Sequence, residues 1–217
     1  MISIGTYLAS IDLKDAYFHV PIYEDSKKLL RFEWDGILYE FNCLPFGLST
    51  APRIFTKLMK PVFHYLRNTG LSSVNYLDDF LLLGVSYSDC CNNVLKTRNL
   101  FESLGFSINF KKSCLKPSQT ITFLGFNIDS KRYVITLPLE TQNKIKNVCS
   151  SILKKPRCKI RVFAKLISVL VLATPAFVYG MLYYKTMERE KFLNLRKSNQ
   201  NFESTMSISE TVRNDVK

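Results

Sequence analysis

Apolar positions follow strand spacing in several segments of the first half of the chain. Residues 7–13 form an apolar run that predicts a buried strand. Residues 30–42 alternate apolar and polar positions around Asp35-Gly36, a dipeptide that tolerates the positive φ angles of a tight turn, and so predict a hairpin. Residues 73–84 predict two short strands joined at an acidic pair. Further strand patterns follow at 106–110, 121–128 and 133–137.

Helical spacing separates these strands. One predicted helix begins near Ser49 and continues to about Phe63, with Pro61 as an expected kink. A second is capped by Ser88 and ends at Gly105. The order strand, helix, strand hairpin, helix, strand is the split βαβ arrangement, an antiparallel sheet with two helices on one face.

The pattern becomes helical after Pro138. The predicted fold class is therefore α+β, with a ferredoxin-like sheet domain over 1–137 and an all-helical region over 138–193. Residues 194–217 are polar and are expected to form a tail that leads to a further domain.

One apolar segment raises the question of a membrane helix. Leu166–Tyr184 holds no charged residue over 19 positions, which is the length of a spanning helix. Pro175 favours its division into two packed amphipathic helices instead. We expect two packed helices in this segment and no membrane span. A single membrane-spanning helix is the alternative.

Composition excludes a disordered chain and points to a polyanionic partner. Of 217 residues, 47% are hydrophobic, which is enough for a core, and the net charge is +12. Nucleic acid is the simplest partner, and an ordinary solvated surface is the alternative. Residues 139–217 hold 15 basic and 6 acidic side chains, against 15 and 12 before them. Eight basic residues without an intervening acid are Lys144, Lys146, Lys154, Lys155, Arg157, Lys159, Arg161 and Lys165.

The six cysteines contain no C-x-x-C pair, and the two histidines lie far from metal-ligand spacing. No charged segment followed by an apolar run opens the sequence. We therefore expect free, mostly buried thiols in a reducing compartment, either cytoplasm or nucleus.

Three carboxylates carry the candidate chemistry. Asp78 and Asp79 lie between two predicted strands, and Asp12 ends another. If these strands are neighbours, the three meet at one edge, where carboxylate oxygens suit Mg²⁺. Two such ions about 3.5–4 Å apart activate a 3′-hydroxyl and stabilise the leaving oxygen of an in-line displacement. The alternative is that Asp78 and Asp79 are ordinary turn residues.

Five segments, in order and covering about residues 8–130, resemble the motifs of reverse transcriptases. They are IDLKDAYFHVP at 11–21, LPFGLSTAPRIF at 44–55, YLDD at 76–79, LGF at 104–106 with KKS at 111–113, and FLGF at 123–126. The resemblance is to LTR-type and DIRS-like retrotransposons, chiefly through Phe46 and the helical region 160–184.

This resemblance implies an RNA-directed DNA polymerase that uses dNTPs on an RNA or DNA template by two-metal nucleotidyl transfer. It implies that 1–137 is a polymerase palm with partial fingers inserted at about 24–45, and that 138–193 is a thumb or connection. It also implies a partial chain of a retrotransposon polyprotein, with further fingers residues, a ribonuclease H and other domains. The implied partners are dNTPs and a template–primer duplex.

The resemblance also assigns roles to individual residues. Asp12, Asp78 and Asp79 would be catalytic and would hold two Mg²⁺ ions, or Mn²⁺ as a substitute, with the Leu13 carbonyl as a further ligand. Tyr17 would stack under the sugar and exclude a 2′-hydroxyl, unless it is simply a core aromatic. The implied nucleotide-binding residues are Leu13, Lys14, Asp15, Ala16, Tyr17, Phe46 and Lys112. The implied primer grip is Phe123, Leu124, Gly125 and Phe126, and the eight basic residues would contact the template–primer backbone.

Lys112, or alternatively Lys111, could protonate the pyrophosphate leaving group or be merely solvated. In this resemblance Phe46 replaces a glutamine of retroviral members, which leaves only packing contact with the nucleotide. Two other functions stay open. One is a truncated, weak or inactive remnant that only binds template–primer. The other is a carboxylate-metal phosphotransferase on the same kind of sheet.

Overall fold

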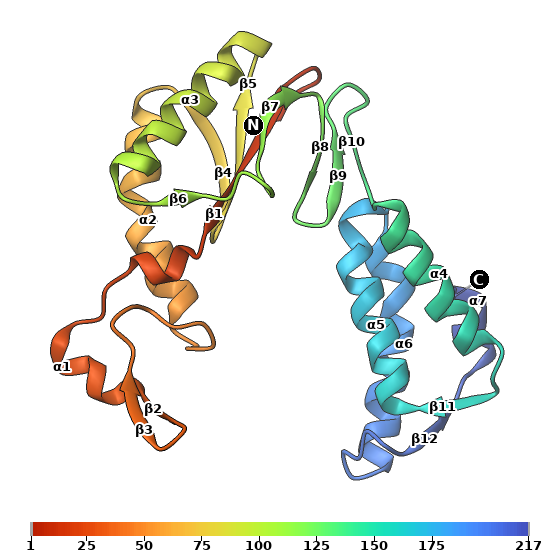
Figure 1. The fold of residues 1–217 in the computed structure, drawn as a ribbon. Helices are drawn as coiled ribbons and strands as arrows, with labels where there is room; N and C mark the ends of the chain where they lie inside the picture. The colour runs from red at the N-terminus through yellow and green to blue at the C-terminus, as the bar shows by residue number, and fades with distance from the viewer. Residues whose placement is uncertain (1, 217) are drawn as a thin grey trace. The chain divides into compact units, whose positions relative to one another are not determined.

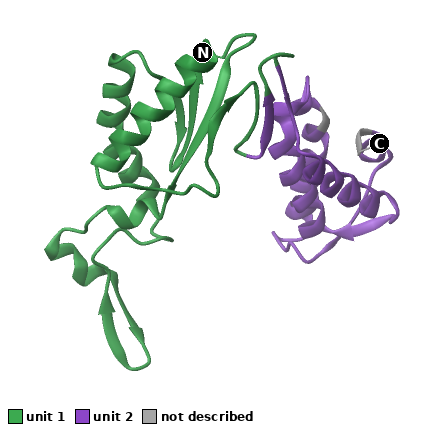
Figure 2. Cartoon of the chain, turned by 45° about the horizontal axis from the view of Figure 1, so that its top comes forward, with its two compact units in different colours: residues 1–124, 129–133 green, residues 125–128, 134–217 purple. Residues whose placement is uncertain are grey.

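The computed structural model describes residues 2–216 and divides them into two compact units (Figures 1 and 2). The first unit holds residues up to 124 together with 129–133, and the second holds 125–128 and 134–217. No helix among the described residues is long and apolar enough to cross a membrane. The apolar stretch Leu166–Tyr184 is instead interrupted by a 3₁₀ turn around Pro175.

An antiparallel sheet forms the centre of the first unit. Its order is β4-β5-β1-β6, and β7 also pairs with β1. The strands are β1 (Tyr7–Lys14), β4 (Ser72–Tyr76), β5 (Asp79–Gly84), β6 (Ser107–Ile108) and β7 (Cys114–Ser118). Four consecutive residues of β5, from Phe80 to Leu83, are buried, which fits a central strand covered on both faces.

Helices α2 (Ala51–Asn68) and α3 (Tyr87–Ser103) lie on the same side of this sheet (Figure 1). Aromatic rings join them to the sheet: Phe80 lies 5.4 Å from Phe63 of α2 and 4.8 Å from Phe101 of α3, centroid to centroid. Such ring pairs add specific geometry to apolar burial. The helices therefore hold β5 in a fixed position beside β1.

A separate hairpin projects from the first unit at the end drawn in orange-red (Figure 1). It consists of β2 (Arg31–Trp34) and β3 (Ile37–Glu40), joined by Asp35 and Gly36 with φ of 52° and 73°. The predicted hairpin and its turn are confirmed. Three short helices precede it: η1 (Ala16–His19), α1 (Glu24–Lys27) and η2 (Lys28–Leu30).

The second unit packs helices around its own core. Its helices are α4 (Leu139–Leu153), α5 (Ile160–Ala173), η3 (Thr174–Ala176), α6 (Gly180–Lys197) and α7 (Glu210–Val216). Two strands, β11 (Arg157–Lys159) and β12 (Thr205–Ser207), pair antiparallel. A separate three-stranded sheet has the order β10-β9-β8. Its strand β8 (Thr120–Phe123) belongs to the first unit, whereas most of β9 (Phe126–Asp129) and all of β10 (Val134–Thr136) belong to the second.

The C-terminal part differs from its prediction. Residues 194–216 do not form a polar tail, because Met206 and Val212 are almost fully buried in the core of the second unit. The β11–β12 pair also means that the region after 138 is not all-helical. Together with Leu195 and Ile208, these buried apolar residues hold the mostly polar segment against the core.

Two local predictions in the first unit were also wrong. Ser86, and not Ser88, caps α3, because Ser86 Oγ accepts a hydrogen bond from the Asp89 N–H. The predicted strand 121–128 is broken into β8 and β9 by Leu124 and Gly125, whose φ angles are positive.

All six cysteines are free, as predicted, but they are not mostly buried. Only Cys90 is buried, Cys114 is exposed, and the other four are intermediate.

Candidate active site

Asp12 and Asp79 are cross-strand partners at the end of the β1–β5 pair. Side chains opposite one another in an antiparallel pair have Cβ atoms about 4.5–5.5 Å apart, so two carboxylates here oppose each other directly. The register from Tyr7↔Gly84 to Asp12↔Asp79 is continuous. Because one face of β1 is buried, the strand register is fixed, and it places Asp12 opposite Asp79.

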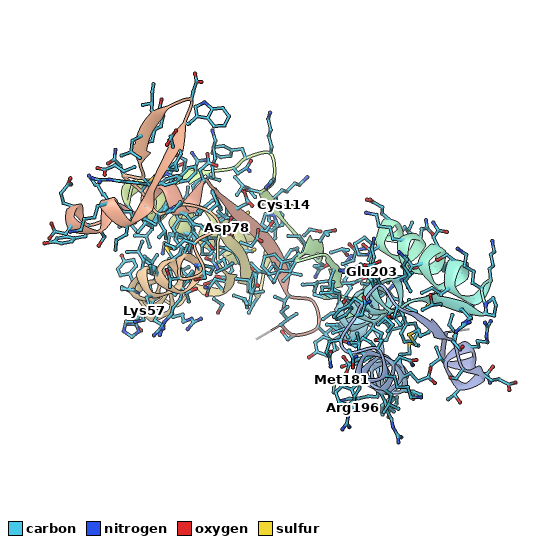
Figure 3. The ribbon with its side chains drawn as sticks, turned by 90° about the horizontal axis from the view of Figure 1, so that it is seen from below. Lys57, Asp78, Cys114, Met181, Arg196 and Glu203 are labelled. Carbon is cyan, nitrogen blue, oxygen red and sulfur yellow. The ribbon has the colours of Figure 1, made fainter. Side chains whose placement is uncertain are left out.

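Asp78 lies in the turn between β4 and β5 (labelled in Figure 3). The residue before it, Leu77, has φ of 54°, a left-handed conformation that tightens the turn. The Asp78 carbonyl oxygen accepts a hydrogen bond from the Leu13 N–H at 3.1 Å. This bond ties the acidic turn to the acidic end of β1.

The charges of the two other carboxylates act on Asp79. The pKa of Asp79 is raised above its ordinary value by burial first, and then by the charges of Asp78 and Asp12, with a side-chain hydrogen bond to Asp12 adding to the effect. The Lys112 charge opposes the rise. Within residues 2–216, no three His, Cys, Asp or Glu side chains already converge tightly enough to hold a metal ion. The site is thus a concentration of negative charge rather than a closed coordination shell.

The fit to a divalent cation follows from that charge. All the side-chain donors are carboxylate oxygens, which suit hard cations such as Mg²⁺. A bound cation would offset the repulsion among these carboxylates, which together with burial, the larger cause, raises the Asp79 pKa.

Tyr17 lies in η1, just beyond the acidic end of β1, and is 8% exposed. Its ring packs 5.1 Å from Phe46 and 5.4 Å from Phe55, between centroids. The Tyr17 pKa is raised by burial, and then by the charges of Asp78 and Tyr76, so the ring lies near the acidic turn. One side chain therefore packs into the core and also lies near the acidic turn.

Other predicted nucleotide-binding residues lie next to Tyr17 in the chain or pack against its ring. Lys14 and Asp15 are exposed at the end of β1, and Ala16 is buried in η1. Phe46 is 59% exposed and also packs against Phe18. Asp15 has φ of 50°, which turns the chain sharply from β1 into η1.

A loop between β6 and β7 brings Lys112 to the acids. The Asn109 carbonyl oxygen accepts hydrogen bonds from the N–H groups of Lys112 and Ser113, so the loop is closed on itself. Ser113 Oγ also accepts a hydrogen bond from the Asp12 N–H at 3.0 Å. Sequence reasoning placed Ser113 in the KKS motif without a role at β1 and did not identify Asn109, because only the folded loop brings them to β1.

The predicted primer-grip residues occupy the β8–β9 turn. Phe123 ends β8 and Phe126 begins β9, while Leu124 and Gly125 form the turn with φ of 47° and 80°. Leu124 is 45% exposed and offers an apolar tip.

The eight predicted backbone-contacting basic residues are all exposed. Glu203, labelled in Figure 3, pairs with Lys159 at 2.9 Å and also with Arg161. These pairs lower the Glu203 pKa, with the Arg161 hydrogen bond as the largest cause. Lys144 pairs with Glu140 at 2.6 Å. Among the described residues, the other five have no ion pair: Lys146, Lys154, Lys155, Arg157 and Lys165.

Known proteins resemble this chain in both sequence and fold. A family model of reverse transcriptase (RNA-dependent DNA polymerase) matches residues 3–128. A polyprotein of Cassava vein mosaic virus is 30% identical over 146 residues, which is 65% of this chain and 22% of that protein. The Gag-Pol polyprotein of Gibbon ape leukemia virus is 28% identical over 150 residues, 64% of this chain and 9% of that protein.

Among solved structures, the foamy viral protease-reverse transcriptase with an RNA/DNA hybrid has a TM-score of 0.73 at 24% identity. That match covers 97% of this chain and 26% of the foamy viral chain. At this identity it shows a shared fold.

The chain shares its mixed α/β fold with the foamy viral protease-reverse transcriptase. Since the family model matches more than half of its residues, this chain belongs to the reverse transcriptase (RNA-dependent DNA polymerase) family. It spans less than a quarter of the length of the two polyproteins compared above.

Proposed function

We propose that this chain carries the site of template-directed DNA synthesis from dNTPs, on an RNA or DNA template. The observation that carries the proposal is the opposition of Asp12 and Asp79 across β1 and β5, with Asp78 in the adjoining turn. This is an acidic edge inside a protein that otherwise has a net charge of +12. Such an edge suits metal-assisted phosphoryl chemistry on a polyanionic substrate.

The three carboxylates and the Leu13 carbonyl are the proposed ligands of two Mg²⁺ ions, with Mn²⁺ as a substitute. Bound ions would activate the primer 3′-hydroxyl and offset charge on the leaving oxygen. The protein's part is to hold its acids close despite their repulsion, which adds to the larger effect of burial in raising the Asp79 pKa. Lys112 supplies a positive charge that reaches Asp79 and is the proposed proton donor to pyrophosphate.

Tyr17 is the proposed selector of deoxynucleotides. Its ring is held by Phe46 and Phe55, and a ring fixed on two sides cannot move aside for a 2′-hydroxyl. Main-chain groups of Lys14, Asp15 and Ala16 would line the triphosphate. Phe46 offers packing contact alone, which supports assignment to LTR-type or DIRS-like elements.

The template–primer duplex would contact the eight basic residues of the second unit. The β8–β9 turn would supply the primer grip. We infer that residues 1–137 form a split βαβ palm with partial fingers at about 24–45, supported by the order β1, α2, β4–β5, α3, β6. The second unit would be the thumb or connection, whose cations neutralise phosphates without reading sequence. Further domains of a polyprotein, including a ribonuclease H, are the proposed partners in the longer protein.

Primer extension separates this function from its alternative, a remnant that only binds duplex. The full 217-residue chain is mixed with an RNA template, a labelled DNA primer, Mg²⁺ and dNTPs, and binding is measured in parallel. Extension of the primer supports the polymerase. Duplex binding without any extension supports the remnant.

A further inference from the structure

The pairing of β1 with β7 shifts its register shortly before the acidic end of β1. Leu8 pairs with Ser118, while Ser10 pairs with Cys114, so two steps along β1 correspond to four along β7. Beyond this point β1 pairs on that side with β6. A ladder that shifts in this way leaves backbone groups without their usual strand partners.

Two serine hydroxyls replace the missing backbone partners. Ser10 Oγ accepts a hydrogen bond from the Cys114 N–H at 3.2 Å, and Ser113 Oγ accepts one from the Asp12 N–H at 3.0 Å. The Asp12 carbonyl oxygen accepts from the Asn109 N–H at 2.9 Å. A half-buried strand N–H needs an acceptor, and for Asp12 that acceptor is a side chain of the β6–β7 loop.

We propose that Ser113 is a positioning residue for the acidic site, and this rests on the function proposed above. Its hydroxyl fixes the Asp12 peptide to the loop that carries Lys112. On its other side, Asp12 is held opposite Asp79 by the β1–β5 register. Ser113 therefore sets the placement of the Asp12 carboxylate relative to the Lys112 ammonium.

A comparison with Ser118 distinguishes this positioning role from a general contribution to the stability of the strand. Ser118 also accepts a backbone hydrogen bond, from the Thr120 N–H at 3.1 Å, but it lies at the far end of β7. Removing the hydroxyl of Ser118, which ends β7, or of Ser113, which immediately precedes β7, deletes one hydrogen-bond acceptor in each case. Only the loss at Ser113 removes a hydrogen bond to the N–H of a proposed metal ligand, whose carbonyl keeps its bond from the Asn109 N–H.

The test compares Ser113→Ala, Ser113→Thr and the matched control Ser118→Ala in the full chain. The first readout is Mn²⁺ affinity, measured by the free-ion signal in electron paramagnetic resonance without nucleic acid. The second is kcat and KM for dNTP incorporation. Thermal melting of each variant establishes that it is folded.

We expect Ser113→Ala to weaken Mn²⁺ binding and lower kcat by about tenfold each, as for other supports of metal ligands, with the KM for dNTP unchanged. Ser113→Thr keeps the hydroxyl and should restore both values, and Ser118→Ala should match the wild type. Wild-type values in Ser113→Ala, or an equal loss in Ser118→Ala, would overturn the positioning role while leaving the proposed function intact. If the wild type itself neither binds Mn²⁺ nor extends primer, the proposed function fails, and the positioning role falls with it.

Discussion

Asp12 and Asp79 face each other across an antiparallel strand pair, and their neighbour Asp78 adds a third negative charge. Like charges in directly opposed positions destabilise a sheet. The fold therefore holds a repulsive arrangement, and packing of Phe80 between α2 and α3 stabilises the strand that carries it.

Asp79→Asn should accordingly stabilise the protein in the absence of metal. Removing one of two opposed charges relieves up to about 1 kcal/mol, which corresponds to roughly 2–4 °C in Tm for a chain of this size. The measurement is thermal melting in EDTA at neutral pH, with Asp35→Asn in the exposed hairpin as the charge-matched control. A lower Tm for Asp79→Asn, or an equal rise in the control, contradicts the repulsion.

The sign of the pH dependence follows from the raised Asp79 pKa. A carboxylate with a raised folded-state pKa binds its proton more tightly when folded, so its contribution to stability is lost as the pH rises through that pKa. The Tm advantage of Asp79→Asn should therefore be largest at neutral pH. It should shrink as the pH falls and Asp79 becomes protonated.

Glu203→Gln should strengthen duplex binding by the second unit. Glu203 pairs with both Lys159 and Arg161, and its removal makes these two cations available to phosphates. The slope of log K against log salt should then steepen by about one to two. Fluorescence anisotropy over a salt series measures it, and Glu33→Gln makes the same charge change in the first unit. If the slopes of the two variants agree, net charge alone explains the effect.

Tyr17→Val should relax the exclusion of ribonucleotides, because it removes the ring held by Phe46 and Phe55. We expect the ratio of kcat/KM for dNTP over rNTP to fall by about tenfold or more, as for other steric contacts in a rigid site. Tyr17→Phe keeps the ring and should keep the ratio. Single-nucleotide incorporation measures both, and an unchanged ratio in Tyr17→Val leaves Tyr17 as a core aromatic.

Gly84→Ala should destabilise the first unit through a backbone clash. A Cβ at Gly84 would lie 2.4 Å from the Cys90 backbone nitrogen, where α3 crosses the end of β5. Such overpacking costs typically about 1–3 kcal/mol. At Gly36, a Cβ has no neighbour within 4 Å and only the positive φ opposes it, so Gly36→Ala should cost about 1 kcal/mol. Urea unfolding compares the two, and equal losses would contradict the clash.

The sequence predicts the elements whose signals are local. Asp35-Gly36 marks its own hairpin, and the acidic pair at 78–79 marks the joint between two apolar strands. The break of strand 121–128 at Leu124 was missed, because a leucine in the left-handed region has no local signature. The fold of residues 194–216 was missed because only tertiary contacts bury Met206 and Val212.

Some features of the candidate site could likewise be predicted from the sequence, and others depend on the fold. The three acids are visible in the sequence, since carboxylates that end apolar strands are unusual there. Which acid faces Asp12 depends on the strand register, and it is Asp79. The support by Ser113 comes from a residue 101 positions away, so it appears only in the folded chain.

The most direct test of the central claim is Mg²⁺-dependent primer extension by the full chain with its acids neutralised one at a time. Asp12→Asn and Asp79→Asn should each lower extension by at least about a hundredfold while duplex binding persists, because both would hold the ions that the chemistry requires. Asp35→Asn should extend primer like the wild type. Extension at the wild-type rate by either Asp12→Asn or Asp79→Asn would contradict the claim that this acidic edge is the polymerase site.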